Sequence, residues 1–178
     1  MKFDGIKKVS EGRFIDRYDL YYTTEDDKKK VYEIISRNKD IKTIDDVHNN
    51  KTDGVVIVAT DENDERILIN KEYRMSVGDY VYNFPAGLID AGETPEIAAK
   101  RELKEETGLD VSGAQGGYLF TYKRENPGEG DNYFVDVYRF VMDVKEEDLH
   151  LQEEETDGHM FATLNQIKEF AAQGKFLH

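Results

Sequence analysis

Three glutamates and one arginine crowd the segment RELKEETGL, residues 101–109. At about 100° per residue, a helix would place Glu102, Glu105 and Glu106 within an arc of about 100°, with Arg101 at its edge. Like charges four residues apart, and acid in the last turn of a helix, both disfavour folding. Oxygen ligands clustered without His or Cys are typical of a Mg²⁺ or Mn²⁺ site. A solvated charged face is the alternative that the helix alone leaves open.

The helix that carries this cluster is predicted at about residues 95–107. Thr94 is suited to cap its N-terminus, Pro95 to occupy its first position, and Gly108 to end it. The side opposite the glutamates should face a core through Ala99, Leu103 and Thr107.

The residues before the helix extend the pattern. Gly87, five residues, Glu93, seven residues and then segment 101–109 match GX5EX7REUXEEXGU at every fixed position, where U is a bulky aliphatic residue. The chain therefore resembles a Nudix hydrolase, and the matching box covers 23 of the 178 residues.

This resemblance implies a metal centre. In the family the carboxylates of the REUXEE segment bind the metal, which here are Glu102, Glu105 and Glu106, with Glu102 and Glu106 as direct ligands. The backbone oxygen of Ala86 matches a further metal ligand of the family. Arg101 would orient the carboxylates, with a plain surface ion pair as the alternative. The expected cofactor is Mg²⁺, and Mn²⁺ could replace it.

The loop before the helix has its own predicted roles. Gly87 would let the backbone approach a ligand closely. Glu93 would hold the loop against the helix, although compensation of the helix dipole would explain it equally well.

Other features resemble the ADP-ribose pyrophosphatase branch of the family. Its N-terminal strands resemble GRFIDRYDLYY, residues 12–22. Arg74 matches an arginine expected to contact phosphate, with an ordinary surface arginine as the alternative. Phe14 is a candidate for stacking on adenine, although a lone aromatic is more often part of a core or an interface. Asn83 departs from the branch, which usually has Glu before PAG.

The branch also has an acidic loop that supplies the catalytic base or a further metal ligand. LQEEETDG, residues 151–158, fits that loop. Glu153 and Glu155 are favoured over Glu154, and a solvated acidic loop is the alternative. Pro127 matches a downstream proline of the branch only loosely.

The expected activity is Mg²⁺-dependent hydrolysis of the pyrophosphate bond of ADP-ribose or a related nucleoside diphosphate sugar, giving a nucleoside monophosphate and a sugar phosphate. One alternative is hydrolysis of nucleoside triphosphates, including oxidised ones. Another is an ADP-ribose sensor that binds without turnover, although complete REUXEE carboxylates argue against it.

Composition limits the partners. Lys and Arg number 24 and Asp and Glu 38, so the net charge is −14. Such a chain disfavours nucleic acid and anionic membranes, and it needs cations to bridge it to a phosphate-bearing substrate. There is no cysteine, and no apolar run approaches the roughly 18 residues of a membrane span. The first ten residues lack the apolar stretch of a signal peptide, so we expect a cytoplasmic protein.

The elements predict an α+β fold. We expect a Nudix-type mixed sheet packed between helices, preceded by an antiparallel hairpin with strands near residues 11–23 and 31–37. Residues 1–53 would form this strand region and a linker containing one short helix, and residues 54–178 the hydrolase domain. Exposed aromatics in the hairpin need cover, so we predict a dimerisation element and a homodimer. Further strands are expected at 54–60, 66–70, 80–84, 117–122 and 133–144, a loop at 85–93, and a last helix at 164–174.

Overall fold

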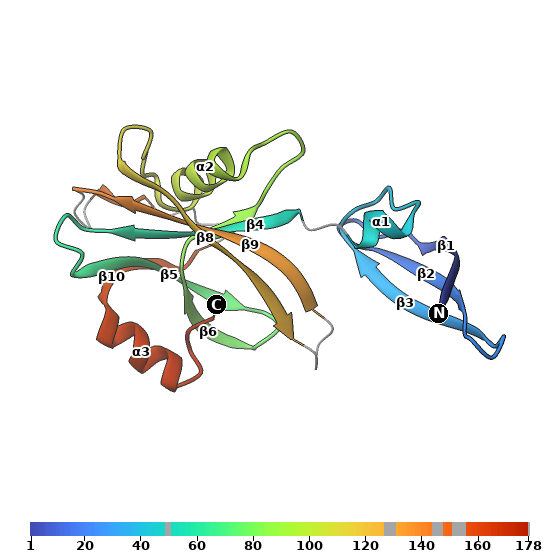
Figure 1. Cartoon of the computed structure of the whole chain (residues 1–178). Coiled ribbons are helices and arrows are strands. Elements are labelled where there is room, and N and C mark those ends of the chain that lie inside the picture. Colours follow the sequence, from blue (N-terminus) through green and yellow to red (C-terminus); the bar gives the residue numbers. More distant parts are fainter. Residues whose placement is uncertain (49–50, 127–130, 144–147, 151–155, 178) are drawn as a thin grey trace. The chain divides into compact units, whose positions relative to one another are not determined.

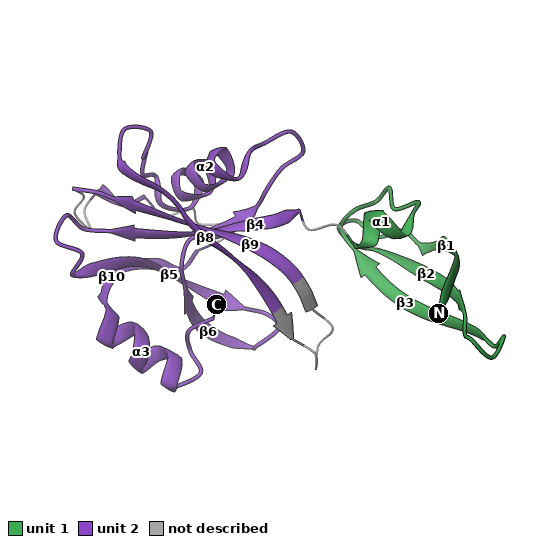
Figure 2. Cartoon of the chain, in the orientation of Figure 1, with its two compact units in different colours: residues 1–50 green, residues 51–178 purple. Residues whose placement is uncertain are grey.

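The computed structural model describes residues 1–48, 51–126, 131–143, 148–150 and 156–177. The chain divides into two compact units, residues 1–50 and 51–178, shown in different colours in Figure 2. Each unit has its own buried hydrophobic residues, and each is described by itself.

Unit 1 is a three-stranded antiparallel sheet with one short helix. Its strands are β1 (Lys2–Ser10), β2 (Asp16–Thr23) and β3 (Lys29–Ser36), in the order β1-β2-β3, and its helix is α1 (Ile44–Val47). Strands β2 and β3 form the predicted hairpin. The prediction missed β1, whose sequence KFDGIKKVS is mostly polar.

One face of this sheet is buried and the other is open. Tyr18 and Leu20 are almost completely buried and pack with Ile41 and Ile34. Strand β3 pairs with β2 alone among the described strands. Its residue Ile35 is 70% exposed. Unit 1 therefore presents a strand edge with an exposed apolar side chain.

Unit 2 is built on a seven-stranded mixed sheet with the order β10-β5-β4-β9-β8, in which β6 pairs with β5 and β7 pairs with β4. Strands β4 and β9 run parallel, and the other pairs are antiparallel. The strands are β4 (Thr52–Thr60), β5 (Arg66–Arg74), β6 (Asp79–Asn83), β7 (Ala86–Leu88), β8 (Gln115–Asn126), β9 (Asp131–Val141) and β10 (Gly158–Thr163).

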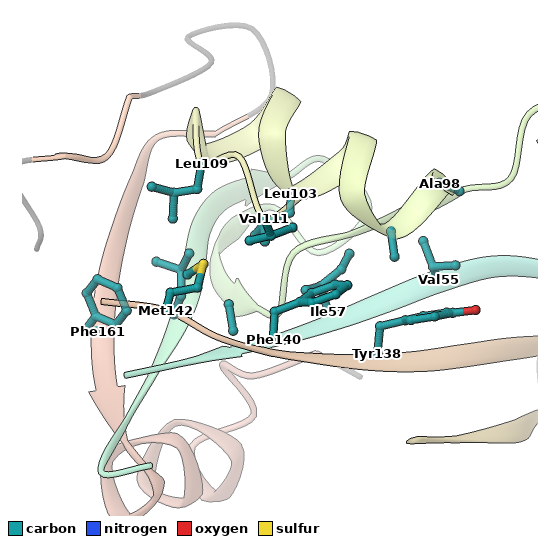
Figure 3. Close-up of a cluster of buried hydrophobic side chains, with 13 residues drawn as sticks. Val55, Ile57, Ala98, Leu103, Leu109, Val111, Tyr138, Phe140, Met142 and Phe161 are labelled. Carbon is teal, nitrogen blue, oxygen red and sulfur yellow. The ribbon is translucent and has the colours of Figure 1, made fainter. Parts of the chain in front are cut away.

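Helices α2 (Pro95–Thr107) and α3 (Leu164–Ala172) cover opposite faces of this sheet (Figure 1). Successive side chains of β5 point to opposite faces of the sheet and so contribute to two different cores, one under α2 and one under α3. Leu68 packs in the cluster under α2, drawn in Figure 3, and the next residue, Ile69, packs with Ile167 of α3. The predicted α+β fold, with a mixed sheet between helices, is confirmed.

Helix α2 forms as its sequence predicts. The Thr94 side chain accepts a hydrogen bond from the Ile97 amide at 3.3 Å, and Gly108 ends the helix with a left-handed φ of 76°. The predicted inner side is buried, at Ala99, Leu103 and Thr107.

Two strands of unit 2 were not predicted. Strand β7 lies inside the expected loop 85–93, where three residues pair with β4. Strand β10 follows the acidic segment and pairs along the outer edge of β5. Across the described ranges, no helix combines the length and apolar character required to span a membrane.

Candidate functional site

Arg101 joins most of the acidic groups of the site. Its Nε and Nη2 donate to the two carboxylate oxygens of Glu93, at 2.8 and 2.9 Å. Its Nη1 donates to Glu102 at 2.7 Å and to Glu105 at 2.9 Å, and Nη2 also reaches the Leu88 carbonyl at 2.9 Å. The guanidinium therefore links the loop before α2 to the helix carboxylates. The role of orienting those carboxylates stays a prediction.

These ion pairs offset part of the repulsion between the glutamates that the sequence predicted. The hydrogen bonds from Arg101 hold the pKa of Glu93 below its usual value, and in return Glu93, followed by Glu105 and Glu102, raises the pKa of Arg101. The side chain of Arg101 is only a quarter exposed, which limits screening by water. The acidic cluster is therefore less unfavourable for folding than the glutamates alone predict.

Glu102 lies directly against the backbone of Gly87. A Cβ placed on Gly87 would overlap with the carboxyl carbon and both oxygens of Glu102. Gly87 is part of β7, where it pairs with Val55 of β4, and Ala86 pairs with Val56. The glycine therefore gives the Glu102 carboxylate its place beside the strand that carries the Ala86 carbonyl.

Glu106 is buried against the sheet, with 8% of its surface exposed. Its Oε2 accepts a hydrogen bond from Asn70 Nδ2 of β5 at 2.7 Å. The sequence predicted Glu105 and Glu106 on one acidic arc, but the two residues differ in burial: the Glu105 side chain is 53% exposed. An ionised carboxylate is buried only where partners compensate for lost water, and Asn70 is one such partner.

Asn70 is in turn contacted by His159 of β10, whose Nδ1 lies 2.9 Å from Asn70 Oδ1. On its other side Asn70 stands opposite Asn83 of β6. Burial lowers the pKa of His159, which favours the neutral imidazole. Sequence reasoning missed both Asn70 and His159, because they lie far from the box along the chain. It noted Asn83 only as a departure from the branch.

The donor set of this site fits a divalent cation, although it is not a ready-made cage. Within the described residues, no three acidic or histidine side chains come together in a preformed metal-binding group. Glu102 and Glu105 are held by Arg101, and Glu106 by Asn70. All the candidate donors are oxygens, and the Glu102 carboxylate packs on the strand that carries the Ala86 carbonyl. Hard oxygen donors of this kind suit Mg²⁺ or Mn²⁺.

The other predicted residues are not gathered at this cluster by the described contacts. Arg74 is at the end of β5 and pairs with Glu72 of the same strand. Phe14 belongs to unit 1, where it is 65% exposed and lies under the Arg13 guanidinium at 4.9 Å. Glu153, Glu154, Glu155 and Pro127 lie outside the described residues.

Unit 2 is thus a mixed sheet between two helices, with the acidic helix α2 packed on the glycine-containing strand β7. The NUDIX domain profile matches residues 50–178. The chain belongs to the NUDIX domain family.

Individual relatives share parts of the sequence. The chain is 38% identical over 108 residues to "Putative nudix hydrolase 2" of Caenorhabditis elegans, covering 59% of this chain and 45% of the relative. It is 32% identical over 107 residues to "ADP-ribose pyrophosphatase" of Saccharomyces cerevisiae, covering 58% of this chain and 43% of the relative. The chain therefore spans less than half the length of these curated relatives.

A solved structure shares the fold over nearly the whole chain. The "Crystal structure of ADP compounds hydrolase" aligns with a TM-score of 0.59 at 19% identity, covering 97% of this chain and 84% of that chain. At this identity the likeness shows the fold alone.

Proposed function

We propose that this protein hydrolyses the pyrophosphate bond of ADP-ribose or a related nucleoside diphosphate sugar, with Mg²⁺ as cofactor and Mn²⁺ as a possible substitute. The products would be a nucleoside monophosphate and a sugar phosphate. The observation that carries the proposal is the packing of Glu102 on the Gly87 backbone, with the nearly buried Glu106 four residues further along the same helix. The yeast relative's printed name, ADP-ribose pyrophosphatase, supports the choice of substrate.

Glu102, Glu105, Glu106 and the Ala86 carbonyl would hold the metal. When bound, Mg²⁺ supplies positive charge against the pyrophosphate oxygens and activates a water molecule. This charge matters because a chain with a net charge of −14 otherwise repels an anionic substrate.

The remaining side chains would bind, orient or move protons. Arg101 would keep Glu102 and Glu105 in place through its Nη1, while its bonds to Glu93 anchor the loop. Arg74 would contact a phosphate and Phe14 would stack on the base. Glu153 or Glu155 would supply the catalytic base or a further metal ligand.

We also propose that unit 1 mediates a homodimer. Strand β3 has a second strand edge with no partner among the described strands. Exposed edges pair readily with another chain. The exposed Val31 and Ile35 would then be covered at the interface.

A substrate panel tests the activity. The full chain is incubated with Mg²⁺ and, separately, ADP-ribose, other nucleoside diphosphate sugars, or nucleoside triphosphates, and the products are resolved by anion-exchange chromatography. We expect AMP and ribose phosphate from ADP-ribose, and no product when EDTA replaces Mg²⁺.

The same panel separates the alternatives. Faster turnover of triphosphates than of diphosphate sugars would show a triphosphate hydrolase. Tight ADP-ribose binding without any product, in either Mg²⁺ or Mn²⁺, would show a sensor. Either result would refute the proposed activity.

A further inference from the structure

Three polar side chains form a row on the face of the sheet below α2. Asn70 of β5 is in the middle, His159 of β10 is opposite it on one side, and Asn83 of β6 is opposite it on the other. Directly opposed residues share a face, with Cβ atoms about 4.5–5.5 Å apart. Asn70 is 3% exposed and Asn83 is 8% exposed. Burying polar groups in a largely hydrophobic core costs stability unless hydrogen bonds compensate.

The hydrogen bonds of this row run in one direction. An ionised carboxylate only accepts, so the group that Asn70 presents to Glu106 Oε2 at 2.7 Å is its NH₂. The amide oxygen of Asn70 then faces His159 Nδ1 at 2.9 Å. An amide oxygen also only accepts, so Nδ1 carries the proton. The bonds therefore pass from His159 to Asn70 to Glu106.

This direction gives each residue a separate task. Asn70 binds the carboxylate of Glu106 and limits the rotation of a side chain with three rotatable bonds. His159 does not bond that carboxylate; it hydrogen-bonds the Glu106 backbone and the Asn70 amide, and the second contact fixes which end of the Asn70 amide points to Glu106. The link joins α2 to β5 and β10, two paired strands of the sheet.

We propose that Asn70 and His159 are positioning residues that hold the Glu106 carboxylate in the orientation required by a divalent cation. The inference rests on the proposed function, because it takes Glu106 as a metal ligand. Groups that hydrogen-bond a metal ligand typically change metal affinity by about 10–100-fold when they are removed. Neither residue belongs to the box, and both act through Glu106.

The test is calorimetric titration of the full chain with Mn²⁺, without nucleotide. Asn70→Ala removes the donor to Glu106. His159→Phe keeps a flat ring but removes the Nδ1 proton, whereas His159→Asn places an amide nitrogen close to the position of Nδ1. Thr60→Val is the matched control, because it removes a buried hydroxyl that donates to Asp64 in the same unit. Thermal unfolding in EDTA reports whether each variant is folded.

We expect Mn²⁺ binding to weaken by about 10–100-fold in Asn70→Ala and His159→Phe, and to stay within about threefold of wild type in His159→Asn and Thr60→Val. The Mg²⁺ concentration for half-maximal activity should rise in the same order. The KM for nucleotide at saturating Mg²⁺ should be nearly unchanged. If Asn70→Ala fails to fold, the two His159 variants decide the question.

Four results would overturn or separate the proposals. Wild-type Mn²⁺ affinity in His159→Phe, or equal losses in His159→Phe and His159→Asn, would refute the positioning roles even if the wild type hydrolyses ADP-ribose. The expected order of affinities in a protein that hydrolyses nothing would support positioning and refute the proposed activity. No Mn²⁺ binding by the wild type would refute both.

Discussion

Replacing Gly87 with alanine perturbs the place of the Glu102 carboxylate directly. The new Cβ would overlap with the carboxyl group, and ordinary contacts begin at 3.4 Å. The carboxylate must therefore withdraw by more than an ångström. Misplacing a reacting group by about 1 Å costs about 100-fold in rate, so we expect kcat/KM for ADP-ribose to fall by about that factor.

The fold should tolerate this change. Gly87 does not have a positive φ, so alanine can adopt its backbone conformation. The atoms in the way belong to the end of a flexible side chain, which can move aside. We expect the free energy of unfolding, from urea titration in EDTA, to change by less than about 1 kcal/mol. Gly113→Ala is the control, because no atom lies within 4 Å of its added Cβ.

A second substitution tests whether the clash with Glu102 causes the rate loss of Gly87→Ala. Glu102→Asp shortens the side chain by one methylene, which withdraws the carboxylate from the site of the new Cβ. If the clash with Glu102 is the cause, the rate losses of Gly87→Ala and Glu102→Asp should fall well short of adding in the double variant. Gly87→Ala with a rate within about threefold of wild type, or two losses that simply add, would refute the assigned geometry.

Four further changes test other parts of the structure. Glu106→Gln keeps an oxygen for the Asn70 amide, so the protein should fold normally; turnover should fall by about 100-fold or more in steady-state assays, because a metal ligand contributes several kcal/mol to charge stabilisation. Leu103→Ala opens a cavity under α2 and should cost about 2–5 kcal/mol in urea unfolding, and a loss below 1 kcal/mol would contradict its burial. Arg101 lowers the pKa of Glu93, so this ion pair stabilises the fold fully above the unfolded pKa near 4.5 and less as the pH falls through and below that value. Glu93→Gln should therefore flatten the dependence of the melting temperature on pH between neutrality and acid. An unchanged pH profile would refute the stabilising role of the Arg101–Glu93 ion pair. Ile35→Lys should dissociate the proposed dimer in sedimentation velocity without changing the fold of unit 1, and an unaffected dimer would place the interface elsewhere.

Helix α2 could be predicted from the sequence because its signals are local. A capping threonine, a proline at the first position and a terminal glycine lie within 15 residues of one another, from Thr94 to Gly108. The arc of glutamates follows from helical periodicity alone. Local signals do not report burial against other elements. That Glu106 is nearly buried while Glu105 is exposed could be learned only from the packing of α2 on the sheet.

The partners of the glutamates could not be predicted in the same way. Asn70 is 36 positions from Glu106, and His159 is 89 positions from Asn70. Such contacts depend on strand order and register, which no short segment specifies. Strand β10 was missed for a related reason: GHMFAT is short, and it gains its structure by pairing with β5.

The guanidinium of Arg101 has a consequence for the order in which the working protein is assembled. Many small metal-binding domains stay unfolded until their ion arrives, because binding of the ion supplies the free energy of folding. Here a cation from the same helix already serves as the counter-ion for Glu93, Glu102 and Glu105. Under the proposed function, the chain would therefore fold first and take up the divalent ion afterwards by exchange with that counter-ion. Scarcity of divalent ions would then lower the number of active molecules and leave the number of folded molecules unchanged.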